Sequence, residues 1–540
     1  MLTGTLANMV DTARKMDPTI SYACGFVSGM QKILPKDVDP ACDTDPEGNV
    51  ELAGNETESI QLLIYAFEQD LEKTAVEVGP VVSADGKSVS SGITVQASPV
   101  GFVKTGQPPY EVKYVGWYPD PILDFLRLFD IKQGDVQPVW IRVRTQPGFP
   151  AGDYHCDLTV KPANAAPYKI DLNMHVWGFD VPEERHLRTA MSLYDSFLAK
   201  AYGTETDEMR MKYEDFFLDY RINPDNIYRA SPPKIDDLER WDKLGLNAFN
   251  LIYVQAIKDM KPGEPYPEEE LKKVFDNLDS IIPQLKEKGL YEKAYLYGFD
   301  EINSDTFFAM KDAMEKIKTR YPDLCLMTTA FDASYGEDTK IDAIDAWVPL
   351  TPSYDKDRAD RARARGKQVW WYICCEPVAP YANWFIEYDA IDTRSLMGMQ
   401  TAKYEPDGFL YYAMMRWPHT TKPITDGPYT DWPPVSFEDF NGDGSIACAG
   451  PDGPLATIRL ENIRDGIEDY EYFRLLREEI KRLKAVQGNA ADDALKQAED
   501  ALIIGDDVVE STTKFSKDPN VILAKRRQVA EAILAARKVK

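Results

Sequence analysis

The apolar residues of this chain change their spacing near Val181-Pro182, and this change constrains the fold more than any other feature. Before it, short segments of alternating apolar and polar residues are separated by Gly, Pro, Asn and Asp, which is typical of a β-sandwich. The clearest segments are residues 61–67, 139–145, 154–160 and 168–177. We therefore predict an N-terminal β-sandwich domain over residues 1–182.

After residue 182, short apolar strands alternate with longer helical stretches, such as 271–288 and 306–320, in the pattern of repeated β-α units. The candidate strands are residues 188–194, 226–228, 248–254, 293–299, 324–329, 346–350, 368–374 and 408–415. Eight such strands predict a (β/α)8 TIM-type barrel over residues 183–455. Residues 456–540 are expected to form helices that pack on the barrel. The predicted fold class is thus a multidomain chain, all-β and then α/β.

Charge and residue counts exclude several classes of function. The chain has 62 basic and 89 acidic residues, a formal charge of −27, and such a surface repels nucleic acid and anionic lipid. Its apolar runs are far shorter than the roughly 20 residues of a membrane-spanning helix. Seven cysteines and four scattered histidines give neither a disulfide framework nor metal-ligand spacing. We expect no metal, no cofactor, no nucleic-acid partner and no membrane span, and the oligomeric state is left open.

One segment partly matches a calcium loop. Residues 439–444 fit its first half, but Gly450 stands where a bidentate Glu is expected, so a tight turn is favoured over a calcium site.

The first residues, Met1 to Gly4, lead into a polar stretch without the basic flank and apolar core of a signal peptide. We expect a bacterial-type protein that is exported to the periplasm or secreted and whose leader is absent from this sequence. A cytoplasmic location is left open.

Two adjacent carboxylates carry the strongest sign of chemistry. The segment YLYGFDE, residues 295–301, is an apolar strand that ends in Asp300 and Glu301 just before a helix. Active sites of barrels lie at this carboxyl end of the strands. Burial can raise the pKa of one acid while hydrogen bonds keep the other ionised, which divides the roles of proton donor and anion. The alternative is that both residues only cap the following helix.

Several motifs, taken together and in this order, resemble glycoside hydrolase family 123 and its uncharacterised relatives. They are YPDP at 118–121, AGDY at 151–154, YGFDE at 297–301, NWFIE at 383–387, GFLYY at 408–412 and RDGIEDYEY at 464–472. The resemblance implies a β-N-acetylgalactosaminidase that uses the 2-acetamido group of its substrate as the nucleophile. Asp300 would orient that group and stabilise the oxazolinium-like intermediate, and Glu301 would act as acid and base. This retaining, substrate-assisted scheme needs no metal or cofactor.

Other residues near the strand ends are expected to bind the sugar, because sugar faces stack on aromatic rings and hydroxyls need polar partners. The predicted substrate-binding residues are Asp195, Tyr297, Tyr354, Trp371, Glu376, Asn383, Trp384 and Trp417. Trp384 and Trp417 are the preferred stacking pair, although any single aromatic residue is more often part of a core.

Two alternatives stay open. Glu376 follows the strand 368–374, so a retaining glycosidase for a different sugar, with Glu301 as acid/base and Glu376 as nucleophile about 5 to 5.5 Å away, is the second hypothesis. The third is a catalytically silent carbohydrate-binding protein. Sugar identity (galacto or gluco), linkage and aglycone are not fixed by any motif.

Overall fold

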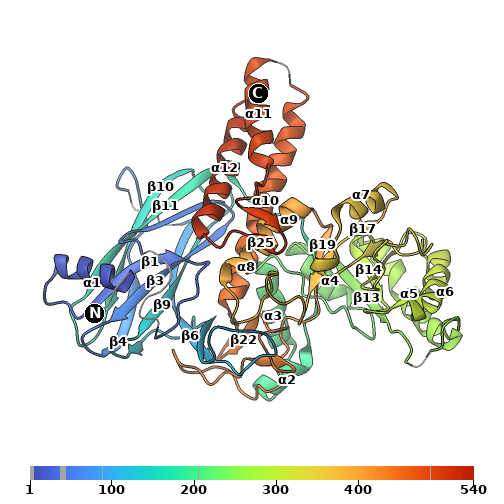
Figure 1. Cartoon of the computed structure of the whole chain (residues 1–540), viewed down its shortest axis with the longest axis horizontal. Coiled ribbons are helices and arrows are strands. Elements are labelled where there is room, and N and C mark those ends of the chain that lie inside the picture. The colour runs from blue at the N-terminus through green and yellow to red at the C-terminus, as the bar shows by residue number, and fades with distance from the viewer. Residues whose placement is uncertain are drawn as a thin grey trace.

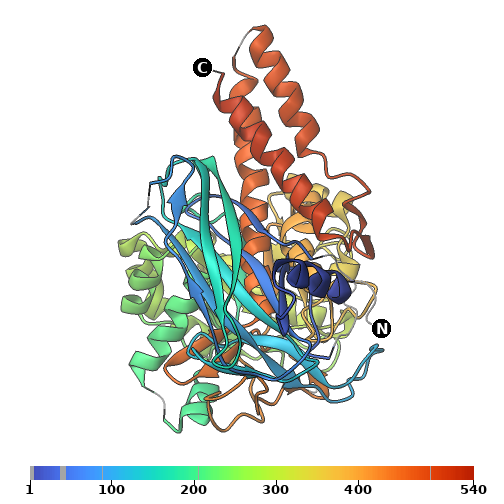
Figure 2. The ribbon, with the colours of Figure 1, turned by 90° about the vertical axis from the view of Figure 1, so that its left-hand side faces the viewer.

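A computed structural model describes residues 5–36, 44–87, 89, 91–204, 206–258, 260–486 and 488–539. Met1 to Gly4, on which the leader argument rests, and Cys42 lie outside these ranges. The strands of the N-terminal part lie on one side of the molecule and the parallel strands on the other, with helices of the C-terminal part rising between them (Figures 1 and 2).

The N-terminal part contains two sheets. The first has the order β1 (Tyr22–Ser28), β3 (Thr57–Ala66), β9 (Val136–Thr145), β6 (Ile93–Lys104) and β7 (Trp117–Ile122), all antiparallel. The second has the order β2 (Gly48–Gly54), β11 (Tyr168–Asp180), β10 (Gly152–Lys161), β4 (Leu71–Val78) and β8 (Phe129–Ile131), with β5 (Val82–Ser83) also on β10. Helix α1 (Thr5–Met16) precedes them.

The two sheets share one apolar core. Leu62 and Val139 of the first sheet and Leu158 and Leu172 of the second belong to the same buried cluster. Burial along β11 alternates residue by residue, as the sequence predicts, whereas β3 is buried on both faces. The second face of β3 is therefore covered by something other than the partner sheet, and this is α10, described below.

The second half of the chain contains parallel strands in two sheets. One has the order β13 (Phe249–Val254), β14 (Ala294–Gly298), β15 (Cys325–Thr328), β16 (Ala346–Trp347) and β17 (Gln368–Val369). The other has the order β12 (Arg188–Met191), β19 (Gly408–Tyr411) and β18 (Trp371–Ile373). The five-stranded sheet forms half of a barrel. Seven of the eight candidate strands coincide with these elements.

The predicted strand at 226–228 is wrong. These residues form a turn, and the only pairing there is an isolated parallel bridge between Ser192 and Asp225. Side chains take the place of a backbone ladder, because the carboxylate of Asp225 accepts from the Asn250 amide at 2.7 Å and Asn226 Oδ1 accepts from the Tyr228 amide at 2.9 Å. Such local side-chain bonds favour turns over strands.

Helices connect the parallel strands. They are α2 (Asp195–Tyr202), α3 (Asp207–Asp219), α4 (Ile235–Lys243), α5 (Glu268–Lys288), α6 (Phe307–Arg320), α7 (Lys356–Ala364), α8 (Ala390–Ser395), a π-helical turn (Leu396–Gln400) and α9 (Thr401–Tyr404). Helix α5 shows why the sequence pattern was informative: three glutamates occupy its first turn, and Gly289, at φ 71°, ends it in the left-handed conformation.

After β19 the chain forms the short hairpins β20 (Val435–Phe437) with β21 (Phe440–Asn441) and β22 (Ala447–Gly450) with β23 (Gly453–Ala456). Three helices follow, α10 (Ile458–Leu483), α11 (Asn489–Leu502) and α12 (Pro519–Arg537), with the hairpin β24 (Val509–Ser511) and β25 (Lys514–Phe515) before α12. These helices pack on each other and project from the rest of the molecule (Figure 1). Within the described ranges, no helix is long and apolar enough to cross a membrane.

Helix α10 joins the two halves. It packs against β3 and β7 on one side and against α8 and the π-helical turn on the other. The approach to the π-helical turn is close, because a Cβ added at Gly466 would lie 2.7 Å from the Met397 Cβ. Only glycine allows this spacing.

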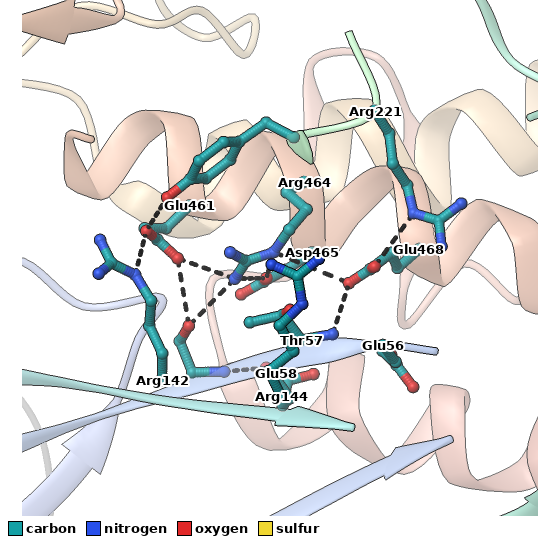
Figure 3. Close-up of polar contacts among 12 residues, drawn as sticks. Glu56, Thr57, Glu58, Arg142, Arg144, Arg221, Glu461, Arg464, Asp465 and Glu468 are labelled. Carbon is teal, nitrogen blue, oxygen red and sulfur yellow. Dashed lines mark hydrogen bonds and ion pairs between the residues drawn. The ribbon is translucent and has the colours of Figure 1, made fainter. Parts of the chain in front are cut away.

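Charged side chains fill much of the boundary between β3 and α10 (Figure 3). Arg142 Nε donates to Glu461 at 2.6 Å, and Arg464 pairs with Glu461 at 2.8 Å. Farther along, buried Arg394 donates to both Glu58 oxygens at 2.8 Å and to Asp469 at 2.8 and 2.9 Å. We call these groups, with Glu56, Arg221, Asp465, Glu468 and Arg526, the interface charge network. Each carboxylate is buried, so its partners are required.

The network sets the protonation of its members. Burial alone would raise the pKa of Glu58, but Arg394 and Arg526 outweigh it and hold that pKa at about 2. Glu468 has the opposite outcome, since burial raises its pKa to about 7 despite the nearby Arg221.

We expect Arg394→Met to lower the free energy of unfolding by about 3 to 5 kcal/mol, because it leaves Glu58 and Asp469 buried without this partner. The control is Arg144→Met, which removes an exposed pair with Asp219 and should cost less than about 1 kcal/mol. Urea unfolding followed by tryptophan fluorescence measures both. Equal losses for the two variants would contradict the prediction.

Glu468 predicts a pH dependence. Its folded-state pKa is raised from 4.5 to about 7, so between these values the folded chain holds a proton that the unfolded chain has released. The free energy of unfolding therefore falls as pH rises through this window. Glu468→Gln should flatten the slope of the urea midpoint between about pH 5 and 7, while the surface control Glu51→Gln should leave it. An unchanged slope in Glu468→Gln would refute the assignment.

Candidate active site

The turn after β14 presents the two adjacent carboxylates. Strand β14 is fully buried, and the chain then turns through Phe299, Asp300 and Glu301. Phe299 and Glu301 have φ values of 54° and 50°, in the left-handed region that side chains other than glycine avoid at a cost of about 1 kcal/mol or more each. The Phe299 amide donates to the Val254 carbonyl at 2.9 Å and holds this turn in place.

Three hydroxyl groups hold the carboxylate of Asp300. Its Oδ1 accepts from Tyr297 and, at 2.8 Å, from Thr329, and its Oδ2 accepts from Tyr228 at 3.2 Å. The Tyr297 and Thr329 oxygens also lie 2.8 Å apart, but each hydroxyl has a single hydrogen and directs it to Asp300, so this contact is not a further hydrogen bond. Burial, and then the charge of Asp300, raises the pKa of Tyr297 and of Tyr228 well above the usual value. Both phenols therefore stay protonated and act as donors that fix the orientation of Asp300.

Glu301 has a different environment. Its amide donates to the Thr329 hydroxyl at 3.0 Å, and its Oε1 accepts from the Tyr372 hydroxyl at 2.5 Å. Burial and the charge of Asp300 raise the pKa of Glu301, and the Tyr372 hydrogen bond partly opposes this rise. One acid is thus held by three donors, and its neighbour has a raised pKa and a single side-chain donor.

Alternation along β17 and β18 decides which aromatic residues face the carboxylates. Trp370 and Tyr372 belong to the cluster on the concave face of the parallel strands, together with Tyr297. Trp371 points to the opposite face, where its ring lies 5.3 Å from Tyr354. The prediction that Trp371 and Tyr354 bind substrate is therefore corrected: the period of two along a strand places Tyr372, not Trp371, beside Glu301.

The predicted residues Asn383, Trp384 and Trp417 are all buried. The Trp384 ring stacks on Phe409 with centroids 5.1 Å apart, and the Trp417 indole N–H donates to the Ala447 carbonyl at 3.1 Å. Asn383 Nδ2 donates to the carbonyls of residues 374 and 377, and its Oδ1 accepts from the Trp384 amide. No ring face or amide of these three is open to a sugar: Asn383 and Trp384 hold the loop after β18, and Trp417 packs on Trp432 after β19.

Asp195 and Glu376 follow β12 and β18, so both lie at the carboxyl end of the parallel strands, as Asp300 does after β14. Asp195 is the first residue of α2 and follows the end of β12. Glu376 is exposed just after β18. The charges of Glu376 and Glu301 both act to raise the pKa of the neighbouring Cys375 thiol. Tyr297 also lies at the site, but it is fully buried and holds Asp300.

Three groups at the site were not singled out from the sequence: Tyr228, Thr329 and the exposed ring of Phe331. Thr329 follows β15, so the rule that sites lie at strand ends could have identified it. Tyr228 lies in the turn mistaken for a strand, and no motif marks it. Phe331 lines a cavity of about 130 Å³ at the ends of β15 and β16, and its amide donates to the Ile302 carbonyl.

A larger cleft, of about 830 Å³, lies elsewhere. Its lining includes Arg188 and Lys293 at the starts of strands and Arg221 and Glu468 of the interface charge network. It is therefore at the opposite end of the parallel strands from Asp300. In the described part of the chain, no group of three or more His, Cys, Asp or Glu side chains is placed to hold a metal ion.

The partial calcium motif forms a turn. Asp443 is buried and accepts from the hydroxyls of Tyr411 at 3.0 Å and Tyr412 at 2.8 Å. Burial raises its pKa to about 6, which these two hydrogen bonds partly oppose. The carboxylate is thus occupied by phenols at the base of the loop that follows β19.

Comparison with known proteins finds similarity to one family of glycoside hydrolases. Residues 243–476 match the model of the glycoside hydrolase 123 catalytic domain. The fold is similar to that of a family 123 glycoside hydrolase from Clostridium perfringens, with 15% identity, coverage of 96% of this chain and 98% of that chain, and a TM-score of 0.68. A family 39 glycoside hydrolase from Bacteroides cellulosilyticus WH2 matches with 12% identity, coverage of 78% and 82%, and a TM-score of 0.33. No curated protein sequence matches. The predicted resemblance to family 123 is confirmed, and the match to the family model indicates a glycoside hydrolase.

We expect Tyr372→Phe to raise the pKa of Glu301 further, because the substitution removes the hydroxyl that stabilises its charged form. The titration can be followed by NMR of glutamate labelled with ¹³C at the carboxyl, with Glu301→Gln to assign the signal. Tyr354→Phe is the matched control, since its hydroxyl donates to the Tyr404 carbonyl and not to Glu301. An unchanged Glu301 titration in Tyr372→Phe would disprove the assignment.

Proposed function

We propose that this chain is a retaining glycoside hydrolase that releases terminal β-linked N-acetylhexosamine with the substrate's 2-acetamido group as nucleophile. The observation that carries the proposal is the contrast between Asp300, held by three hydroxyls, and Glu301, whose pKa is raised. A fixed anion beside a proton donor is what substrate assistance needs.

In the first step, Glu301 gives its proton to the glycosidic oxygen as that bond to the anomeric carbon breaks. The acetamido oxygen bonds to the anomeric carbon, and Asp300 accepts a hydrogen bond from the acetamido N–H and stabilises the positive charge on the resulting ring. In the second step, Glu301 takes a proton from water, whose oxygen attacks the anomeric carbon and reopens that ring. The Tyr372 hydroxyl stabilises Glu301 while it is charged.

The sugar proposed is N-acetylgalactosamine, on the basis of the family resemblance. The similar enzyme from Clostridium perfringens is described in terms of glycolipid glycan hydrolysis, and we propose a glycan or glycoconjugate substrate for this chain as well. Export from the cell remains part of the same proposal.

We infer that the parallel strands close into a (β/α)8 barrel over residues 183–455. Only Trp370 separates β17 from β18, which supports one continuous set of strands. The remaining gap contains the Ser192 to Asp225 bridge and a backbone hydrogen bond from the Tyr253 amide to the Arg229 carbonyl at 2.9 Å. The shared core of the two N-terminal sheets supports a β-sandwich over residues 1–182, with residues 456–540 as a helical extension.

Glu376 supports a second candidate function. It is exposed at the same edge as Glu301, and this position suits a nucleophile in a retaining glycosidase for a different sugar. A silent carbohydrate-binding role is disfavoured, because a raised pKa beside an oriented carboxylate is what a proton donor needs.

Nitrophenyl β-glycosides with and without a 2-acetamido group test these alternatives. We expect hydrolysis only of the acetamido sugars, with Asp300→Asn lowering kcat about 10²- to 10⁴-fold and Glu376→Gln changing it less than about 10-fold. Glu301→Gln should lose more activity on sugars with poor leaving groups, because these need the proton most.

Other outcomes would overturn the proposal. Activity on sugars without the acetamido group, together with azide rescue of a Glu376 variant, would establish the covalent route. Saccharide binding without turnover of any glycoside would instead establish the silent module.

A further inference from the structure

The Arg416 side chain has no hydrogen-bond acceptor among the residues that the structure describes. Arg416 lies five residues after Tyr411, the last residue of β19, and its amide donates to the Gly444 carbonyl at 2.8 Å. Its guanidinium carbon lies 5.2 Å from the centroid of the Phe437 ring. Its Nε is buried, and this atom has no hydrogen-bond partner within the described ranges. No carboxylate of the described chain lies within ion-pair distance of Arg416 either, in contrast to buried Arg394 with its two acids.

Arg416 follows β19 of the three-stranded sheet, and Asp300 follows β14 of the five-stranded sheet, so both lie in turns at the carboxyl ends of parallel strands. Strand β19 pairs with β12, with Met191 opposite Tyr411, so the loops after these two strands begin side by side. Tyr194, just after β12, donates to the Tyr412 carbonyl at 3.2 Å. Burial raises the pKa of Tyr194 to about 12, and the charges of Arg416 and Asp300 act on it in opposite directions. Both charges thus act on the Tyr194 hydroxyl, which agrees with the placement of Arg416 and Asp300 at the same end of the strands.

Acidic residues surround Arg416 at the carboxyl end of the strands, so its lack of an ion-pair partner among the described residues is informative. The chain carries a net charge of −27, and that end itself carries Asp300, Glu301, Glu376 and Asp443. Of these acids, Asp443 is influenced by the charge of Arg416, but its carboxylate accepts from Tyr411 and Tyr412 and makes no ion pair with Arg416. The guanidinium carbon lies over the Phe437 ring instead, a cation–π contact that uses none of the N–H donors of Arg416. Guanidinium groups bind planar or tetrahedral oxyanions through two parallel hydrogen bonds.

We propose that Arg416 binds an oxyanion, a carboxylate or a sulfate, carried by the glycan substrate, and so gives the site a preference for acidic glycans. The inference rests on the proposed function and names the substrate class of the same site. A sulfate would belong to the hexosamine itself or to its neighbour, and a carboxylate would belong to a neighbouring acidic sugar.

Paired substrates test the proposal. The kcat/KM values of the wild type, Arg416→Gln and Arg416→Lys are compared on nitrophenyl N-acetylhexosaminides with and without an O-sulfate. A second pair consists of N-acetylhexosamine-terminated oligosaccharides with and without a sugar carboxylate. We expect the kcat/KM of the wild type to be at least about 10-fold higher on the acidic substrate of one pair than on its neutral counterpart. Arg416→Gln should abolish that preference and change kcat/KM on neutral substrates by less than about 3-fold. Arg416→Lys should retain part of the preference. The pair whose kcat/KM ratio changes in Arg416→Gln shows whether Arg416 binds a sulfate or a carboxylate.

Arg527→Gln is the matched control, because Arg527 is an exposed arginine of α12 paired with Glu51. It should leave both preferences unchanged. Thermal unfolding of each variant checks that the fold is kept, and Arg416→Lys keeps the charge and the aliphatic stem if the glutamine variant does not fold.

Binding separates this inference from the proposed function. Calorimetry with N-acetylhexosamine and its sulfated form, and with the acidic and neutral oligosaccharides, needs no turnover. If no glycoside is hydrolysed but Arg416→Gln loses only the binding of the acidic sugars, the role of Arg416 stands and the proposed reaction falls. If acetamido sugars are hydrolysed but acidic and neutral ligands behave alike in the wild type and Arg416→Gln, the reaction stands and the role of Arg416 is overturned.

Discussion

The arrangement of the whole molecule depends on burying ionised side chains between β3 and α10. Removing Arg394, Glu58 and Asp469 from water is costly, and the cost is offset only where every donor meets an acceptor. An apolar contact could slide by one helical turn with little loss, but these pairs are satisfied in one register only. The network therefore fixes how the N-terminal sheets and the parallel strands sit on a shared helix (Figure 3), whatever it adds to the net free energy of folding.

A loop of the N-terminal part contacts the loops near the site. The segment between β6 and β7 lies on the loops that follow β18 and β19, where the Tyr110 hydroxyl donates to half-buried Glu387 at 2.6 Å. Asn441 Nδ2 donates to the Gly106 carbonyl at 3.0 Å and links the same two parts. Two residues farther along, Asp443 holds Tyr411 and Tyr412. The base of the site is thus built from both halves of the chain, and its shape depends on the register that α10 imposes.

The sequence was informative wherever a period or a strand end carried the signal. The parallel strands and the position of Asp300 and Glu301 follow from apolar runs that stop at acids. The period of two could not tell which face of β18 is concave, because that depends on how β18 pairs with β19 and β16 with β17. The predicted substrate-binding residues therefore included Trp371, whereas the structure places Tyr372 beside Glu301. The residues of α10 showed an apolar stripe, but their charges find partners more than 400 positions away in the chain, and no local pattern reports such pairs. Tyr228 was missed for the same reason, since a turn placed it beside Asp300.

The site also shows why its acids are held by hydroxyl groups. A lysine or arginine bonded to Asp300 would fix its orientation as well as Tyr297, Thr329 and Tyr228 do. Its positive charge would also favour the ionised form of the adjacent Glu301 and lower the raised pKa that a proton donor needs. Phenols with raised pKa values donate hydrogen bonds without adding charge, so Asp300 is oriented and Glu301 is left as an acid. A cation that binds the substrate here must likewise not bond to Asp300 or Glu301, because it would lower the pKa of Glu301. This explains why Arg416 lies over Phe437 and does not pair with either acid.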